Sequence, residues 1–109
     1  MPGKFELKTA ANGKFFFNLK AGNGEIILSS QMYSSKPAAK KGIASVMKNA
    51  ADEKRFEVKD AANGEIFFVL KAANTQVIGK SETYPTKAAL QKGIASVMKN
   101  APTATIAEA

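Results

Sequence analysis

Apolar and charged residues alternate with a period of two in two short stretches of the chain, residues 5–8 (Phe-Glu-Leu-Lys) and residues 56–59 (Phe-Glu-Val-Lys). This alternation is typical of a strand with one buried face. An Asn-Gly dipeptide follows each stretch, at Asn12-Gly13 and at Asn63-Gly64. Because Asn-Gly suits the two positive-φ positions of a type I′ turn, the pattern predicts two β-hairpins.

The second strand of each predicted hairpin is a mostly apolar run, Phe15–Lys20 in the first hairpin and Ile66–Lys71 in the second. Asn23-Gly24 then predicts another tight turn, before a third strand at residues 25–29. The corresponding turn in the second half carries Asn74-Thr75 instead. Because a β-branched side chain resists positive φ, we expect this turn to have a different geometry.

A helix is predicted after the third strand of each half. Ser35 and Thr86 stand where an N-cap belongs, and Pro37 suits a first helical turn. Asn49 and Asn100 are natural C-terminal stops. Apolar residues between these signals fall on one helical stripe, which consists of Ala39, Ile43, Val46 and Met47 in the first helix and of Leu90, Ile94, Val97 and Met98 in the second. Each half therefore predicts three antiparallel strands and one helix.

The two halves are copies of one unit. Residues 4–50 align with residues 55–101 at a constant offset of 51 and without a gap, with 28 identities in 47 positions. Residues 41–50 are identical to residues 92–101. The chain is therefore a tandem repeat, and its two units should be related by an approximate symmetry.

The repeats leave a linker at residues 51–54 and a C-terminal strand or tail at residues 102–109. A unit of about 50 residues has a marginal core by itself. We therefore predict one domain over residues 1–109, an α+β fold with one helix per repeat, in which two β3-α units join through a shared antiparallel sheet or by packing helix face on helix face. We also expect residues 53–59 to form a long strand that serves both halves, with residues 104–108 as its counterpart.

Two further features are specific enough to suggest a family. They are the Tyr33-Ser34-Ser35 sequence at the start of the first helix and the repeated helix sequence Lys-Gly-Ile-Ala-Ser-Val-Met-Lys-Asn-Ala. With these features and the Asn-Gly hairpins, the chain resembles the YegP-like family of small bacterial proteins of unknown function, from residue 4 to about residue 105. The resemblance implies an α+β fold in which repeats merge into one sheet and exchange their last strands. It implies no catalytic or ligand-binding residues.

The composition excludes several kinds of site. The chain has no cysteine and no histidine, so disulfides, cysteine or imidazole metal sites and histidine-based triads are excluded. The acidic residues are scattered, and no glycine-rich phosphate loop occurs. We therefore predict no catalytic residue, no metal and no cofactor, which favours a non-enzymatic interaction or structural module. The longest apolar run, residues 66–70, is too short for a membrane span, so we expect a cytoplasmic protein without membrane contact.

Lysine dominates the charge. Sixteen basic residues, all but Arg55 lysines, stand against nine acidic ones and give a net charge of +7. Such an excess attracts polyanions, whereas a single arginine leaves little bidentate recognition of phosphate or guanine. The candidate polyanion-binding residues are Lys8, Lys20, Lys59 and Lys71 on the predicted strands, and Lys41, Lys48, Lys92 and Lys99 on the predicted helices.

Two phenylalanines are candidates for stacking or self-association. In the second strand, every second side chain shares one face of the sheet, and we expect the face of Phe15, Phe17 and Leu19 to meet the helix. Phe16 and Phe67 are therefore expected on the opposite sheet face, among the strand lysines. Aromatic side chains between lysines are typical of weak, sequence-nonspecific nucleic-acid binding, which is the alternative function. Otherwise the phenylalanines fill a homodimer contact, and the lysines keep the surface soluble.

Each predicted helix also contains an interior glycine, Gly42 or Gly93. Such a glycine costs about 1 kcal/mol relative to alanine and commonly allows another backbone to approach closely. We therefore expect the helices of the two repeats to pack together at these positions. Tyr33 and Tyr84, just before each helix, are expected to anchor the junction between strand and helix and not to serve as reactive phenols.

Overall fold

The alternating sequences form strands in the computed structural model, which describes residues 3–108. The first repeat contains β1 (Lys4–Thr9), β2 (Phe15–Lys20) and β3 (Ile26–Ser29). The second repeat contains β4 (Phe56–Asp60), β5 (Ile66–Lys71) and β6 (Val77–Lys80). Within each repeat the neighbouring strands pair antiparallel, as predicted.

Each repeat continues into a helix, α1 (Lys36–Asn49) or α2 (Lys87–Asn100). Ser35 caps α1, because its hydroxyl accepts a hydrogen bond from the backbone N–H of Ala38 at 3.2 Å. Thr86 caps α2 in the same way. The helices end at the two predicted asparagines. The local signals for the start and the end of both helices are therefore confirmed.

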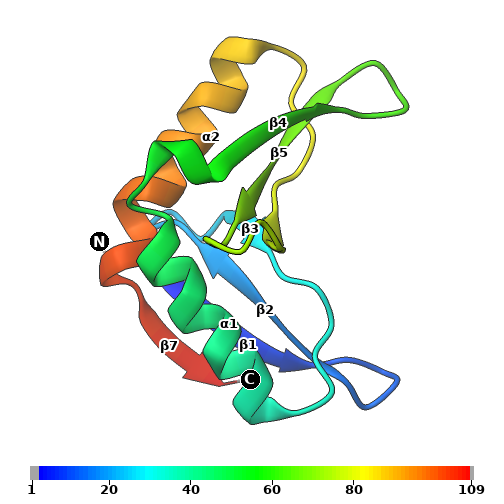
Figure 1. The fold of residues 1–109 in the computed structure, drawn as a ribbon, viewed down its shortest axis with the longest axis vertical. Helices are drawn as coiled ribbons and strands as arrows, with labels where there is room; N and C mark the ends of the chain where they lie inside the picture. Colours follow the sequence, from blue (N-terminus) through cyan, green and yellow to red (C-terminus); the bar gives the residue numbers. More distant parts are fainter. Residues whose placement is uncertain (1–2, 109) are drawn as a thin grey trace.

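The two repeats share one seven-stranded sheet in the order β4-β5-β6-β3-β2-β1-β7, and β7 is Thr105–Glu108. Both helices cover the same face of this sheet (Figure 1). Helix α1 packs on β2 and reaches β6 of the other repeat, and α2 packs on β5 and reaches β3. The predicted α+β fold with a shared sheet is confirmed.

One continuous core fills the space between the sheet and the helices. Because each helix reaches across to the third strand of the other repeat, the apolar stripes of both helices are buried in the same core. The largest fully buried side chains come from both repeats; they are Phe5, Leu7, Phe17, Leu19, Leu28, Ile43, Val46, Phe68, Leu70, Leu90 and Val97.

The Asn-Gly hairpin turns differ from the predicted type. Gly13 has a φ of 83°, but Asn12 is not among the residues with positive φ. The Gly13 N–H donates to the Ala10 carbonyl at 3.0 Å, and the Ala10 N–H donates to the Lys14 carbonyl at 2.7 Å. This is a three-residue loop in which only the glycine is left-handed. Asn63-Gly64 forms the same loop, so the type I′ prediction was wrong at both turns.

The turn at Thr75 has the same geometry as its glycine counterpart. Thr75 has a φ of 70°, and Gly24 has a φ of 85°. The Thr75 N–H donates to the Ala72 carbonyl at 2.9 Å, and the Gly24 N–H donates to the Ala21 carbonyl at the same distance. The expectation of a different geometry was wrong, because the pairing of β5 with β6 holds a β-branched residue in a strained conformation.

The segments that follow the helices differ from each other. After α1, the Asp52 carboxylate accepts a hydrogen bond from the Lys54 N–H at 3.0 Å and caps a 3-10 turn, Glu53–Arg55. The predicted long strand serving both halves was therefore wrong, and β4 pairs with β5 alone within residues 3–108. After α2, a 3-10 turn (Ala101–Thr103) leads into β7, which confirms the C-terminal strand. Strand β7 pairs parallel with β1 of the first repeat.

The helical glycines accommodate tyrosines. A Cβ atom on Gly42 would lie 2.7 Å from Cζ of Tyr33 and would also clash with the Tyr33 hydroxyl; Gly93 has the same relation to Tyr84. The expectation that the glycines bring the two helices together was therefore wrong. The Tyr33 ring stacks on Phe17 with 6.1 Å between ring centroids, which fits the predicted anchoring role. Burial raises the pKa of both tyrosines above the ordinary value, which disfavours a reactive phenolate.

We predict that Gly42→Ala lowers the free energy of unfolding by about 1–2 kcal/mol, because displacing the Tyr33 ring outweighs a gain of about 1 kcal/mol in helix propensity. Urea unfolding followed by circular dichroism measures this change. In a Tyr33→Ala background the same substitution should cost less, because only the Phe17 ring, 3.0 Å from the added Cβ atom, still has to shift. A stabilising effect in the wild-type background would contradict the packing role of Gly42.

We predict that Thr75→Gly raises the free energy of unfolding by about 1 kcal/mol, because glycine adopts positive φ without a Cβ penalty. The matched control is Gly24→Thr in the equivalent turn, which should lower stability by a similar amount. Thermal unfolding of both variants tests the pair. If Thr75→Gly is instead destabilising, the hydrogen bond from the Thr75 hydroxyl to the Asn74 carbonyl, 2.6 Å long, outweighs the backbone strain.

Candidate functional site

The sheet face turned away from the helices carries most of the predicted site residues. Residues directly opposite each other on paired strands share a face, so the strand registers assign this face. Lys8 pairs with Phe16, and Lys59 pairs with Phe67. We call this surface the open face. Its residues are Lys4, Glu6, Lys8, Phe16, Asn18, Lys20, Ile26, Ser29, Glu57, Lys59, Phe67, Val69, Lys71, Val77 and Lys80.

The strand lysines of the open face form ion pairs with two glutamates. The Glu6 carboxylate lies 3.1 Å from the Lys20 ammonium and 3.6 Å from that of Lys8. Glu57 pairs with Lys71 and, at 3.4 Å, with Lys59. Hydrogen bonding to Lys20 and Lys71, with the charges of the neighbouring lysines, holds the pKa of each carboxyl below its ordinary value. These four candidate lysines are therefore partly neutralised, and the face keeps a moderate positive charge.

Phe16 and Phe67 both lie on the open face, where the alternation of residues placed them. They are on β2 and β5, with β3 and β6 between, so three inter-strand spacings of about 4.8 Å put about 14 Å between the two strands. The strand registers also place the two rings toward opposite ends of the sheet, so the rings themselves lie farther apart. The Lys80 ammonium lies 4.8 Å from the centroid of the Phe67 ring and covers it. Ser29 is the equivalent of Lys80 in the first repeat, so Phe16 lacks such a cover.

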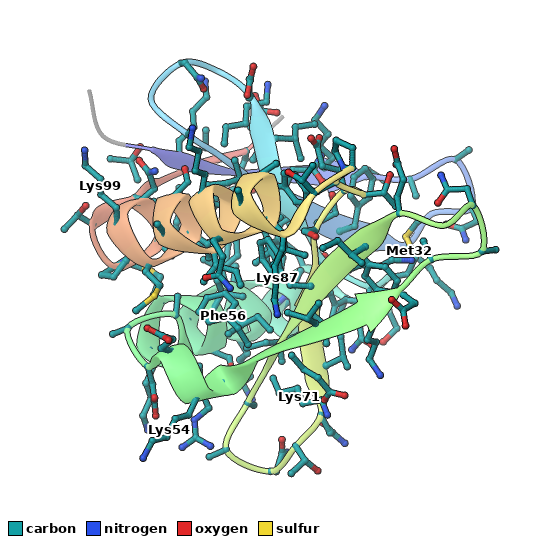
Figure 2. The ribbon with its side chains drawn as sticks, turned by 90° about the horizontal axis from the view of Figure 1, so that it is seen from above. Met32, Lys54, Phe56, Lys71, Lys87 and Lys99 are labelled. Atoms are coloured by element: carbon teal, nitrogen blue, oxygen red, sulfur yellow. The ribbon has the colours of Figure 1, made fainter. Side chains whose placement is uncertain are left out.

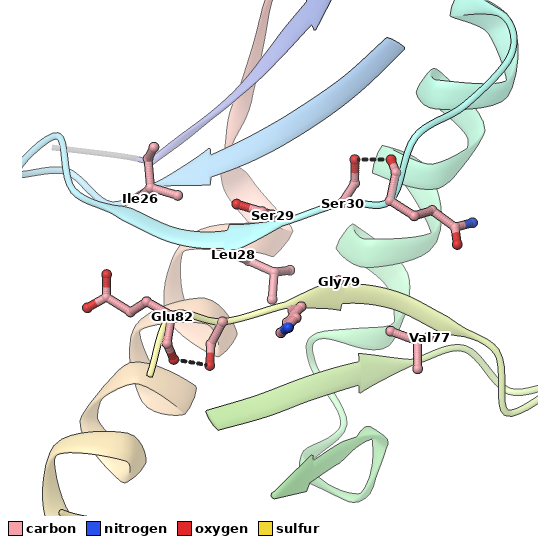
Figure 3. A pocket seen from close by; sticks show the side chains of 10 residues that line it. Ile26, Leu28, Ser29, Ser30, Val77, Gly79 and Glu82 are labelled. Carbon is pink, nitrogen blue, oxygen red and sulfur yellow. Dashed lines mark hydrogen bonds between the residues drawn. The ribbon is translucent and has the colours of Figure 1, made fainter. Parts of the chain in front are cut away.

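A hollow lies at the junction of the two repeats. Strands β3 and β6 pair through a single residue pair, Ser29 and Lys80, and a cavity of about 370 Å³ lies beside this contact. Its walls include Ile26, Leu28, Ser29, Val77, Gly79 and Lys80 (Figure 3). Ile26 and Val77 are 43% and 41% exposed, which is unusual for large aliphatic side chains. We call this cavity the junction hollow.

The symmetry between the repeats breaks in the junction hollow. Leu28 in the first repeat is the equivalent of Gly79 in the second. A Cβ atom on Gly79 would lie 2.6 Å from Cδ2 of Leu28, so the Leu28 side chain fills space that a side chain at position 79 would need. The hydroxyl groups of the nearby serines are already hydrogen-bonded. The Ser30 hydroxyl accepts a hydrogen bond from the Phe17 N–H at 2.9 Å and donates to the Gln31 carbonyl at 2.8 Å, whereas the Ser29 hydroxyl donates to the Asn18 side chain at 2.8 Å. The lining of the hollow therefore offers mainly aliphatic surface, and it also includes Lys80 and Glu82.

The helix lysines lie on the other side of the molecule. Lys41 and Lys48 on α1 line a shallow groove with the turn around Asn74, and Lys92 and Lys99 on α2 line its counterpart. Figure 2 labels Lys99, which lies in the last turn of α2. Each groove has a volume of about 460 Å³ and joins a helix of one repeat to a turn of the other. None of the four forms an ion pair within residues 3–108. The structure therefore splits the eight candidate lysines into two sets.

Sequence reasoning missed the junction hollow. Ile26 and Val77 occupy the same position in the two repeats, next to a turn, and that shared apolar character was the available signal. The pairing of Ser29 with Lys80 joins two strands that are far apart in the sequence, so no local pattern predicts it. Over residues 3–108 there is no group of three acidic side chains arranged to hold a metal ion. In the same part of the chain, no helix is both long and apolar enough to cross a membrane.

The repeats match a known family model twice. The domain of unknown function DUF1508 matches residues 10–57 and residues 61–108, which are offset by the same 51 residues as the repeats. The chain is 51% identical to the UPF0339 protein YegP of Escherichia coli K12 over 106 residues, covering 97% of this chain and 96% of that protein. It is 56% identical to a UPF0339 protein of Mannheimia succiniciproducens over 104 residues, covering 95% and 92%.

Solved structures agree with the fold. The solution NMR structure of Escherichia coli YegP, described as a protein of unknown function, matches with a TM-score of 0.93 at 50% identity and covers 99% of this chain and 93% of that chain. The solution NMR structure of a UPF0339 protein from Shewanella oneidensis matches with a TM-score of 0.91 at 47% identity, covering 99% and 92%. The double match, the close relatives and the shared fold lead to one conclusion: the chain belongs to the DUF1508 family, as a tandem pair of its domains.

Proposed function

We propose that the protein is a non-enzymatic binding module that takes an acidic protein partner on its open face, with an aliphatic side chain of the partner in the junction hollow. The observation that carries this proposal is the aliphatic hollow within a positively charged face. Six lysines and two glutamates give the open face a net charge of +4. Such a face steers an acidic surface toward it, and the hollow supplies apolar contact area. The proposal keeps the cytoplasmic location that the sequence predicts.

Two observations favour a protein partner over nucleic acid on this face. The walls of the hollow carry aliphatic side chains, whereas bases stack on aromatic rings or on arginine. Of the two candidate aromatics, Phe67 is already covered by Lys80. Weak nucleic-acid binding therefore receives less support from the geometry than an acidic protein surface.

The charge of the open face also disfavours a second copy as its occupant. Two open faces packed together would bring like charges, +4 on each, against one another. Like charges brought together without counter-charges cost free energy. An acidic partner has the opposite effect, so we propose it in preference to a homodimer through this face.

We predict that a photo-crosslinking residue at the hollow captures a discrete acidic protein. Val77→p-benzoylphenylalanine, expressed in the native host, should give a protein adduct after irradiation. The yield of this adduct should fall in about 0.5 M salt, because salt screens the attraction between the charged surfaces. The matched control is Ala44→p-benzoylphenylalanine, an exposed position on α1, which should give no such adduct.

Three outcomes would overturn the proposed function. The first is an adduct that nuclease removes, together with binding of single-stranded oligonucleotides near 50 mM salt, where electrostatic binding is strong. The second is an adduct that contains two copies of this chain. The third is equal labelling from Val77 and Ala44, which would mean that the hollow has no specific occupant.

A further inference from the structure

The first strands of the two repeats, β1 and β4, differ in how they are covered although the repeats are equivalent. Strand β7 covers the outer edge of β1. Strand β4 occupies the corresponding place in the second repeat, and no strand within residues 3–108 covers its outer edge. Figure 1 shows β4 and β7 in the upper and lower halves of the molecule. An uncovered edge presents backbone N–H and C=O groups that can pair with another strand.

The covered edge shows what the uncovered edge would accept. Strand β7 runs parallel to β1, with Ile106 opposite Phe5 and Glu108 opposite Leu7. The Glu108 carboxylate lies 2.7 Å from the Lys36 ammonium of α1 and 3.7 Å from that of Lys40. Thus an extended segment binds there through its backbone and through an acidic fourth residue, while its apolar second residue, Ile106, stays 49% exposed beside Phe5.

The apolar residues beneath the two edges differ in exposure. Phe5 and Leu7 are 0% and 2% exposed in the repeat that β7 covers. Their equivalents on β4 are Phe56, which is partly exposed, and Val58, which is 43% exposed. The second repeat therefore leaves apolar surface uncovered at the place where β7 protects the first repeat.

A lysine also lies beside the uncovered edge, as one does beside the covered edge. Lys87 is the equivalent of Lys36, and within residues 3–108 it forms no ion pair. Figure 2 shows Lys87 and Phe56 between the ribbons of β4 and α2. Gln91 stands where the first repeat has Lys40. One ammonium group therefore remains available to a carboxylate at the fourth position of an added strand.

We propose that the outer edge of β4 binds an extended segment of another protein as an eighth, parallel strand. The segment pairs with the backbone of residues 55–58, places an apolar residue beside Phe56 and places an acidic residue near Lys87. Its chemistry is that of Thr-Ile-Ala-Glu, the sequence that β7 presents to β1. Strand addition of this kind takes affinity from main-chain hydrogen bonds and specificity from alternate side chains. Strand β5 and part of β6 separate this edge from the junction hollow, so neither site requires the other.

A second copy of the chain fits this edge less well. Strand β7 of each copy is paired with its own β1, which is favoured because that pairing is intramolecular. If β7 of one copy paired with β4 of a second copy, β1 of the first copy would lose its cover. Repeating this contact would build an open head-to-tail array and not a closed oligomer. We therefore assign the edge to a different protein.

The test is a titration with a synthetic peptide of residues 103–108 (Thr-Ala-Thr-Ile-Ala-Glu), acetylated and amidated at its ends, up to about 5 mM because a short strand buries little surface. We expect saturable amide shifts in the ¹H-¹⁵N spectrum of the full chain at residues 55–60 and at Lys87. A peptide carrying Glu108→Gln should bind about two- to fivefold more weakly, the range expected for one exposed ion pair.

Matched variants separate this edge from the other one. Lys87→Glu should remove the preference for the acidic peptide, and Val58→Lys should abolish binding because a charge at an edge opposes strand addition. The control Lys36→Glu is the corresponding change at the covered edge, and the control Ile106→Lys places a charge on β7. Both should leave peptide binding at β4 unchanged. Unchanged native spectra away from each substitution show that the variants fold.

Other results would overturn the proposal. Shifts confined to β1 and β7, or no saturable shift at β4, would mean that the edge does not accept a parallel strand. Shifts at β4 that appear in the protein alone as its concentration rises, and that vanish in Val58→Lys, would assign the edge to a second copy. Equal affinity for the Glu108→Gln peptide and the unchanged peptide would mean that Lys87 does not contribute to recognition of the segment.

Discussion

The structure depends on the contact between the two repeats, because neither repeat can bury its apolar residues alone. Helix α1 lies against β6 and α2 against β3, so each helix covers a strand of the other copy. Near the axis that relates them, Leu28 occupies the space left by Gly79. Two leucines at these positions would overfill the core, because a close-packed interior does not absorb extra methylene groups without strain. The two copies therefore differ at the point where they meet.

Differences between the copies also shape the candidate surfaces. Lys80 covers Phe67, whereas the first repeat has Ser29 and no lysine at the equivalent position. The helix sequence shared by both copies builds two similar grooves on the opposite side, each completed by a turn of the other copy. A duplicated unit thus supplies a symmetric framework, and a few substitutions make the two halves of the open face chemically distinct.

Local physical chemistry accounts for the parts of the fold that the sequence predicts well. Strand alternation and the caps at Ser35 and Thr86 involve neighbouring residues, and they agree with the structure. The predictions fail where residues far apart in the sequence determine the local conformation. Strand pairing holds Thr75 at positive φ, and a tyrosine occupies the space at Gly42. The positions of the eight lysines followed from the strand and helix patterns, whereas the junction hollow depends on a pairing between the repeats that no local pattern contains.

The pairing of β7 with β1 joins residues about 100 positions apart, from Lys4 to Thr105. During synthesis β1 therefore cannot pair with β7 until residues 105–108 have been made. This interval lasts roughly 5–20 s at translation rates of about 5–20 residues per second. Through that interval the edge of β1 is exposed in the nascent chain, and the edge of β4 is exposed as well once residues 56–60 have been made. Each edge is a template for association with other chains. A product that terminates before residue 105 keeps both edges, which makes premature termination a direct route to aggregation.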